Sequence, residues 1–329
     1  MSERAAQSGQ AAEPGQSALL RAPLPAVEWP TLMLALGCYA LWMLATGWLS
    51  ALSLPLGMVL AALAMALHSS LTHEALHGHP FRDARLNEAL VFPALGAFVP
   101  YRRFRDLHLA HHVDAVLTDP YDDPESNYLD PAVWVRLPGW ARALLRANNT
   151  LLGRMTLGPA IGLFCLLRDD LRALAAGDAR VRDAWLRHLL GLVPVVLWVA
   201  LAPMPLWAWL VAAYGAMSIL KIRTFLEHRA HERASGRTVV IEDRGPLALI
   251  FLNNNLHVVH HMHPRVPWYR LPRLYAENRD FYLRRNGGYR YRSYGEVFAR
   301  HLLRAKDPVP HPLYCAQGRG HAAGAEQAP

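Results

Sequence analysis

The chain has 329 residues, of which 53% are hydrophobic and 18% charged, and its formal net charge is +8 at pH 7. Soluble globular domains carry about 25% charged residues. The shortage here is local, because no Asp, Glu, Lys or Arg occurs between Glu28 and Glu74 or between Arg187 and Lys221. About 20 apolar residues already span a bilayer, so these two stretches exclude an ordinary soluble domain.

Residues 1–28 are rich in Ala, Gln, Pro and Gly and are predicted to form a disordered tail. The first uncharged stretch is too long for one helix and has a natural break at 46–50, which predicts membrane spans over 30–46 and 52–72. The second is broken by Pro203 and Pro205, which predicts spans over 188–202 and 206–223. Each pair is expected to form a hairpin within one domain over 29–303, followed by a loose tail over 304–329.

The charged residues lie outside these predicted hairpins. Segments 82–187 and 264–303 are rich in Arg, whereas the connecting loops carry no charge. The positive-inside rule therefore places both segments and both termini in the cytoplasm, and nucleic-acid binding is not needed to explain the charge. Two shorter apolar stretches, 86–99 and 156–167, are predicted to be interfacial helices. The expected fold is all-α and integral to the membrane, with four transmembrane helices and a cytoplasmic helical cap that carries a metal site.

Histidine is the residue type that points to chemistry. The chain has 17, and most precede the C-terminal tail in four tight groups. Residues three or four apart share one face of a helix, and neutral imidazole is a good ligand for iron, zinc and copper. The groups are His73 and His77 followed by His79; His108, His111 and His112; His228 and His231; and His257, His260 and His261 followed by His263.

All four groups are expected at one face of the membrane, because each lies at the cytoplasmic end of a predicted span or in a cytoplasmic segment. Eight or nine imidazoles are too many for one metal ion. Two ions with four or five nitrogens each would use them and leave a position open for oxygen.

Other chemistries fit the pattern less well. The sequence from His73 to His77 reads His-Glu-x-x-His, the zinc-protease motif, but that interpretation leaves most clustered histidines unused. A metal transporter would place its ligands near the middle of the membrane rather than at one face. Glu74 and His77 form the chain's single Glu-x-x-His, which disfavours a carboxylate-rich di-iron bundle.

The order His-x-x-x-His, His-x-x-His-His, His-x-x-His-His between two membrane hairpins resembles the membrane fatty acid desaturase superfamily, and bacterial members in particular. This resemblance implies two non-haem iron ions, with dioxygen as co-substrate. It implies a further ligand after the fourth span, where His228 fits best and His231 is second. His79 and His263 lie just outside the boxes and are accessory candidates. The implied metal ligands are therefore His73, His77, His108, His111, His112, His228, His257, His260 and His261.

The resemblance implies an O2-dependent lipid oxidoreductase of the bacterial inner membrane, first of all an acyl-lipid desaturase. The alternative is a hydroxylase or ketolase of a lipid, terpenoid or alkane on the same centre. The sequence has no haem, flavin or nicotinamide motif, so a separate electron donor is expected: ferredoxin, rubredoxin or a cytochrome-type carrier with its reductase.

Polar residues beside the boxes are further candidates. Asp119 is predicted either to orient a ligand imidazole or to serve as a turn residue. Asn254 is predicted either to reach the site through a water molecule or to cap a helix. Arg265, Arg270 and Arg273 follow the third box and are candidates for docking an acidic electron carrier. Contact with anionic lipid is the alternative for these arginines.

Overall fold

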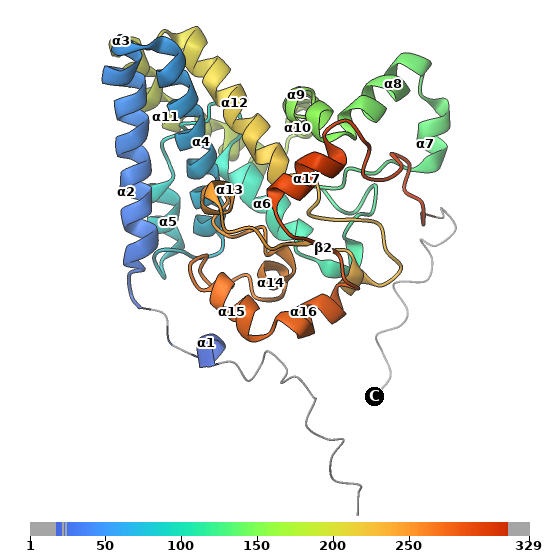
Figure 1. Ribbon diagram of the computed structural model, residues 1–329. Coiled ribbons are helices and arrows are strands. Elements are labelled where there is room, and N and C mark those ends of the chain that lie inside the picture. Colours follow the sequence, from blue (N-terminus) through green and yellow to red (C-terminus); the bar gives the residue numbers. More distant parts are fainter. Residues whose placement is uncertain (1–17, 22, 24, 315–329) are drawn as a thin grey trace, which may run out of the picture.

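A computed structural model describes residues 18–21, 23 and 25–314, which fold into a mostly helical structure with one pair of parallel two-residue strands (Figure 1). The elements are α1 (Ala18–Arg21), α2 (Trp29–Leu44), η2 (Ala45–Leu49), α3 (Ser50–Leu52), α4 (Leu54–Leu76), α5 (Ala84–Leu90), α6 (Tyr101–His111), η3 (Asp114–Val116), α7 (Pro131–Arg136), α8 (Gly139–Asn148), α9 (Leu151–Thr156), α10 (Gly158–Ala175), α11 (Ala179–Leu201), α12 (Leu206–Thr224), η4 (Ala234–Gly236), β1 (Val240–Ile241), α13 (Pro246–Ile250), α14 (His257–Met262), α15 (Leu271–Glu277), α16 (Arg279–Arg285), β2 (Arg290–Tyr291) and α17 (Tyr294–His301).

The first predicted hairpin forms with a later turn than the sequence indicates. Helices α2, η2 and α3 run on as one apolar stretch, Trp29–Leu52, and α4 returns. Gly47 is non-helical inside η2, with φ −89° and ψ −106°, so the predicted break is a kink in a helix that continues. The chain reverses at Ser53, whose backbone is extended.

The second hairpin consists of α11 and α12. Helix α11 begins well before residue 188, because the Asp178 carboxylate accepts from the backbone N–H groups of Arg180 and Val181 and caps the helix. In the described part of the chain, three helices are long and apolar enough to cross a membrane: the Trp29–Leu52 stretch, α4 and α11. Helix α12 occupies the fourth predicted span but carries Lys221 and Arg223 in its last turn. A fourth crossing therefore stays a prediction.

The turns of both hairpins lie at the same end of the molecule. The N–H of Met204 donates to the carbonyl of Thr46 at 3.1 Å, and Trp198 Nε1 donates to the Thr46 hydroxyl at 2.9 Å. Between α4 and α12 the core is rich in alanine, which lets the two helices approach closely. Helices α14 to α16 lie at the other end of α2 and α4 from α3 (Figure 1).

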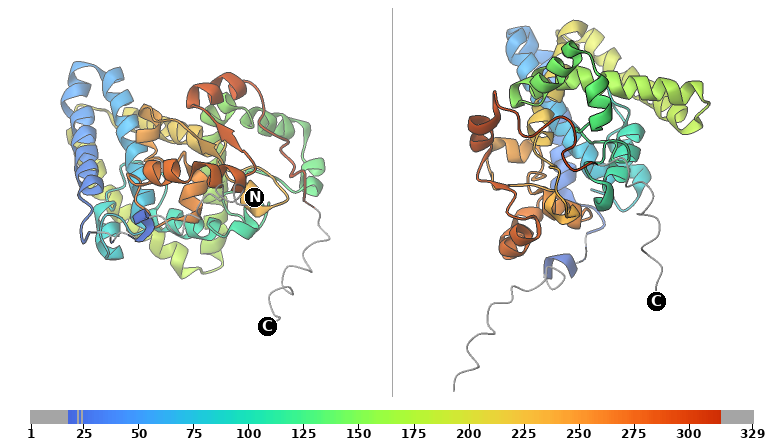
Figure 2. Two further views of the ribbon diagram at one scale, coloured as in Figure 1. Left: turned by 60° about the horizontal axis from the view of Figure 1, so that its bottom comes forward. Right: turned by 90° about the vertical axis from the view of Figure 1, so that its right-hand side faces the viewer.

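The predicted interfacial helix over 86–99 is wrong beyond its first turns. Helix α5 ends at Leu90, and the chain then runs irregularly among the helices up to Pro100. It is held there by backbone contacts, including the N–H of Ala94 to the carbonyl of Gly191 at 3.2 Å. A Cβ at Gly191 would lie 2.4 Å from the carbonyl oxygen of Phe92, so this approach requires glycine. The second predicted interfacial helix lies mostly within α10, which Figure 2 shows from two further sides.

Parts of both predicted tails are packed. Glu28 is 2% exposed, and at the other end of the chain Lys306 and His311 pack beside Tyr128. The backbone of Leu129 donates to the carbonyl of Val309 at 3.0 Å. Residues that the sequence assigned to tails therefore contact the rest of the fold, whereas residues 1–17, 22, 24 and 315–329 of the two predicted tails lie outside the described residues.

Candidate metal centre

The histidine boxes occupy helix ends that converge. His73 lies in the last turn of α4, and His77 caps that helix. The second box forms the last turn and cap of α6, and the third forms most of α14. His228 follows α12 and is fixed by a backbone bridge to Thr238.

The structure brings all nine predicted ligands together in two groups. In each group the candidate ligand atoms lie within 4.8 Å of one another. Histidines four apart in one box join the same group, whereas the middle histidine of the second box and that of the third box each join the other group. The five-histidine group is His73, His77, His108, His112 and His260, and the four-histidine group is His111, His228, His257 and His261.

The spacing of the nitrogens fits metal ligation. In the four-histidine group, Nε2 of His228 lies 2.9 Å from that of His111 and 3.1 Å from that of His257. In the five-histidine group, Nε2 of His112 lies 2.9 Å from that of His108 and 3.2 Å from that of His260. Imidazoles bound at 2.0–2.1 Å to one ion at near-right angles would hold their nitrogens about 3 Å apart.

Unpartnered nitrogens support the same assignment. Nε2 of His73, His77 and His261 is buried and has no hydrogen-bond partner within the described chain. A buried polar atom without a partner costs free energy, and one cation bound in each group would satisfy all three nitrogens. An all-imidazole donor set suits iron, zinc or copper, so the residues fit the two irons implied by the resemblance without selecting iron alone.

Polar acceptors hold the other ring nitrogen of several ligands. Nδ1 of His111 lies 2.7 Å from Asp123, and Nδ1 of His108 lies 3.0 Å from Glu125. Nδ1 of His257 lies 2.8 Å from the side-chain amide oxygen of Asn254, a direct contact where the sequence suggested a water-mediated one. These contacts favour the tautomer with a proton on Nδ1, which leaves Nε2 free to bind a metal.

Asp119 has the other of its two predicted roles. Its carboxylate accepts from the backbone N–H groups of Tyr121 and Asp122 and so shapes the turn after the second box. The sequence pattern does not single out Glu125, and it does not separate Asp123 from Asp119. All three lie in the same acidic turn, and no spacing rule distinguishes the carboxylates that face a ligand from those that face the loop.

Burial also sets the protonation of the ligands. Burial and repulsion from neighbouring histidines lower the pKa of His228 and His257 well below the ordinary value, so both are neutral, which is the form that binds metal. His111 differs: burial opposes its charge, but Glu125 and Asp123 raise its pKa to about 9. The two carboxylates therefore stabilise positive charge at the His111 ring. A bound metal cation would supply this charge in place of a proton.

The accessory histidines lie outside both groups. Nδ1 of His79 lies 2.7 Å from Glu28, in a buried pair near the start of α2. His231 contacts the backbone of Arg233. The His263 ring packs edge-on against Tyr282 at 6.3 Å.

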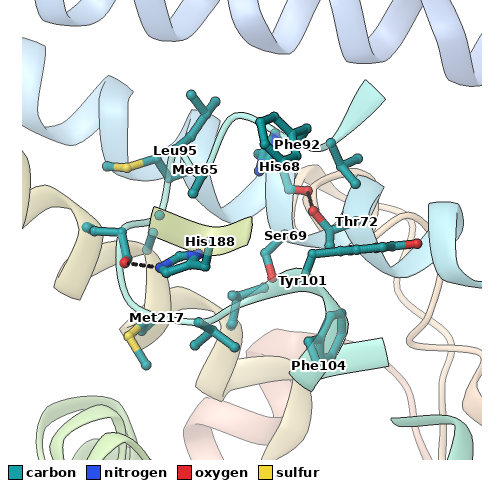
Figure 3. Close-up of a pocket in the computed structure, with 18 of the residues that line it drawn as sticks. Met65, His68, Ser69, Thr72, Phe92, Leu95, Tyr101, Phe104, His188 and Met217 are labelled. Atoms are coloured by element: carbon teal, nitrogen blue, oxygen red, sulfur yellow. Dashed lines mark hydrogen bonds between the residues drawn. The ribbon is translucent and has the colours of Figure 1, made fainter. Parts of the chain in front are cut away.

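One cavity reaches the four-histidine group, and a second lies beside the five-histidine group. The inner cavity, of about 270 Å³, lies between α4, α11, α12 and the irregular segment after α5 (Figure 3). The wide cavity, of about 570 Å³, lies on the other side of α6 and is lined by His228 and Glu125. The cavities share Val99, Phe104, Met217 and Lys221 as a common wall. The Phe104 ring centroid is 5.6 Å from that of His108, so this wall stands beside the five-histidine group.

Comparison with known proteins agrees with this geometry. A family model described as fatty acid desaturase matches residues 46–293, a range that contains both histidine groups. A beta-carotene ketolase from Paracoccus sp. (strain N81106 / MBIC 01143) is 28% identical over 249 residues, which are 73% of this chain and 86% of the ketolase.

Proposed function

Because the chain belongs to the fatty acid desaturase family, we propose that it is a membrane-bound, O2-dependent oxidoreductase that oxidises a lipid chain at a histidine-bound di-iron centre. The observation that carries this proposal is the arrangement of nine imidazoles in two adjoining groups. Stacked rings of His112 and His261, with centroids 4.3 Å apart, join the groups, so two ions held by them would be close neighbours.

Iron with dioxygen and electrons supplies the oxidising power to break an unactivated C–H bond, which amino-acid side chains lack. The chain's own residues do the rest. Asp123, Glu125 and Asn254 each hold one imidazole in orientation, and burial shields six of the nine histidines from water. Phe104 stands between the two cavities and the five-histidine group, where it would set the position of an apolar chain.

Acyl-lipid desaturation is the first candidate reaction, because two cavities that meet beside the histidines suit a long apolar chain oxidised within its length. Ketolation or hydroxylation of a terpenoid or other lipid is the second, and the similarity to a beta-carotene ketolase favours it. Expression in a host with simple lipids, followed by mass spectrometry, distinguishes them. Desaturation removes two hydrogen atoms from the product, whereas hydroxylation or ketolation adds oxygen.

A matched pair of variants tests the centre itself. His228→Ala removes a ligand of the four-histidine group and is expected to lower bound iron and abolish product. His231→Ala removes a histidine three residues away that hydrogen-bonds to the backbone of Arg233 and belongs to neither group, so it is expected to keep both. Equal iron and product in both variants would contradict the proposal.

Electrons are proposed to come from a separate acidic carrier that docks at the arginines after the third box. Arg265 and Arg273 are exposed there. Between them, the backbone N–H of Trp268 donates to the Glu74 carboxylate at 3.1 Å, and Glu74 lies 3.7 Å from Nδ1 of His73. This short route supports docking beside Trp268. The proposed location is the bacterial inner membrane, with this face and both termini cytoplasmic.

A further inference from the structure

A third cavity, of about 350 Å³, is lined mainly by cations and tyrosines. Its four cationic side chains are Arg229, Arg290, Arg300 and Lys306, and Asp307 is the one carboxylate among its lining residues. Tyr128, Tyr289 and Tyr291 complete the polar wall. Tyr128 is 4% exposed and Tyr289 is 8% exposed, so this wall is built into the fold rather than spread on the surface.

The positive charge of this cation-lined cavity is only partly neutralised. Arg290 and Arg300 pair with Glu242 and Glu296, which lie outside the lining. Arg229 donates to the backbone carbonyls of Gly236 and Asn286, and its guanidinium stands 4.4 Å from the Tyr289 ring centroid. Backbone carbonyls carry no net charge, so the Arg229 cation remains available to an anion.

Asp307 does not neutralise the remaining positive charge. It accepts from the Tyr128 hydroxyl and lies 3.7 Å from the Lys306 ammonium, so it is already shared between two groups. Charged groups held away from water are stabilised by opposite charge. The N–H donors of an arginine guanidinium are spaced to bind two oxygens of a carboxylate or phosphate.

The cation-lined cavity adjoins the wide cavity. Tyr128 and Lys306 line both. Lys306 also donates to the backbone carbonyl of His228, whose ring belongs to the four-histidine group. From this junction the wide cavity extends past His228 to Phe104. An amphiphile with its head at Lys306 would thus lay its chain beside the histidines.

We propose that the cation-lined cavity binds the carboxylate or phosphate head of an amphiphilic lipid whose apolar chain lies in the wide cavity. This inference rests on the proposed function and narrows its substrate to anionic amphiphiles. The same chemistry would attract free phosphate, so the test separates the two sources.

Binding is measured by equilibrium dialysis with the full-length protein, purified from iron-supplemented cells, in neutral detergent micelles. The probes are dodecanoate and dodecan-1-ol, which share a chain and differ in charge. A charge-assisted contact strengthens binding of the acid roughly tenfold or more over the alcohol. Arg229→Gln with Arg300→Gln is expected to remove this preference and leave the alcohol unaffected. Arg172→Gln is the control, because Arg172 is an exposed, helix-paired arginine outside the cavity.

Three outcomes would overturn the inference. They are equal affinity for acid and alcohol in the wild type, an unchanged preference in the double variant, and phosphate binding that dodecanoate does not displace, which would show a small-anion site only. Arg300→Gln alone is the milder variant if the double variant misfolds, because Arg300 is 61% exposed in its side chain. Iron content of the same samples reports separately on the proposed function, since absent iron would contradict the di-iron centre whatever the probes show.

Discussion

Replacement of Asp123 by asparagine tests whether the carboxylates around the histidines hold a metal centre in place. Asp123 is 4% exposed and uses one oxygen for Nδ1 of His111 and the N–H of Glu125, and the other for the N–H of Thr118. An amide keeps only one oxygen, so its NH2 group must face a donor in either orientation. The loss of one charge-assisted hydrogen bond costs about 1.5–3 kcal/mol.

Because Asp123 orients His111, this loss is expected to weaken metal binding roughly 10–100-fold. The assay is iron per chain after a graded chelator challenge, read beside the thermal midpoint. Asp119→Asn is the matched control, since Asp119 lies in the same turn and contacts backbone only. If Asp123→Asn retains iron as the wild type does, or if Asp119→Asn loses as much, the orienting role of Asp123 is refuted.

Three further predictions concern the groups, the packing and the pH dependence. His77→Ala and His257→Ala remove ligands of different groups, so each is expected to lose about half of the iron, measured by elemental analysis; loss of all iron in both would argue for one shared site. Gly191→Ala is expected to lower the thermal midpoint at a cost of about 1–3 kcal/mol because its Cβ would meet a carbonyl oxygen, whereas Gly37→Ala, with nothing within 4 Å, should be neutral or stabilising. Burial lowers the pKa of Lys306 from 10.5 to about 8, so between these pH values the unfolded chain binds the Lys306 proton more tightly than the folded chain. The free energy of unfolding is therefore expected to rise as pH increases from 8 to 10.5. Lys306→Met is expected to flatten this rise, measured as the thermal midpoint at each pH.

Apolar pattern predicted the helices of the fold better than their ends. The uncharged stretches located both hairpins, because exclusion of charge is a property of sequence alone. The early start of α11 depends on the Asp178 cap, and a local cap competes with the apolar pattern used to place the span. The irregular chain before Pro100 depends on tertiary contact with Gly191, which no periodicity reveals.

The candidate site was predictable where helical spacing determines it. Spacing of four residues placed His108 with His112 and His257 with His261, but sequence alone left open that His111 and His260 face the opposite groups. The division is set when the helices pack together, and residue spacing within one helix does not reveal it. The carboxylates that orient the histidines are harder to predict from the sequence. Asp119 and Asp123 have the same side chain and differ only in the direction in which the turn points it.

The positions of the two lysines suggest a role for positive charge other than membrane orientation. The chain has only two, Lys221 and Lys306, and both line the wide cavity instead of the surface. Membrane orientation by positive charge does not require a buried lysine, which loses hydration and needs an opposite charge. Five acidic residues line the same cavity, and each already has a positively charged or histidine partner: Asp123 with His111, Glu125 with His108, Asp169 with Arg168, Asp170 with Arg103 and Glu227 with Arg223. Lys306 has Asp307 at 3.7 Å, which it shares with the Tyr128 hydroxyl. A neutral terpenoid would add no charge there, whereas an anionic amphiphile would. Identification of the product therefore tests the interpretation of these two lysines as well as the reaction.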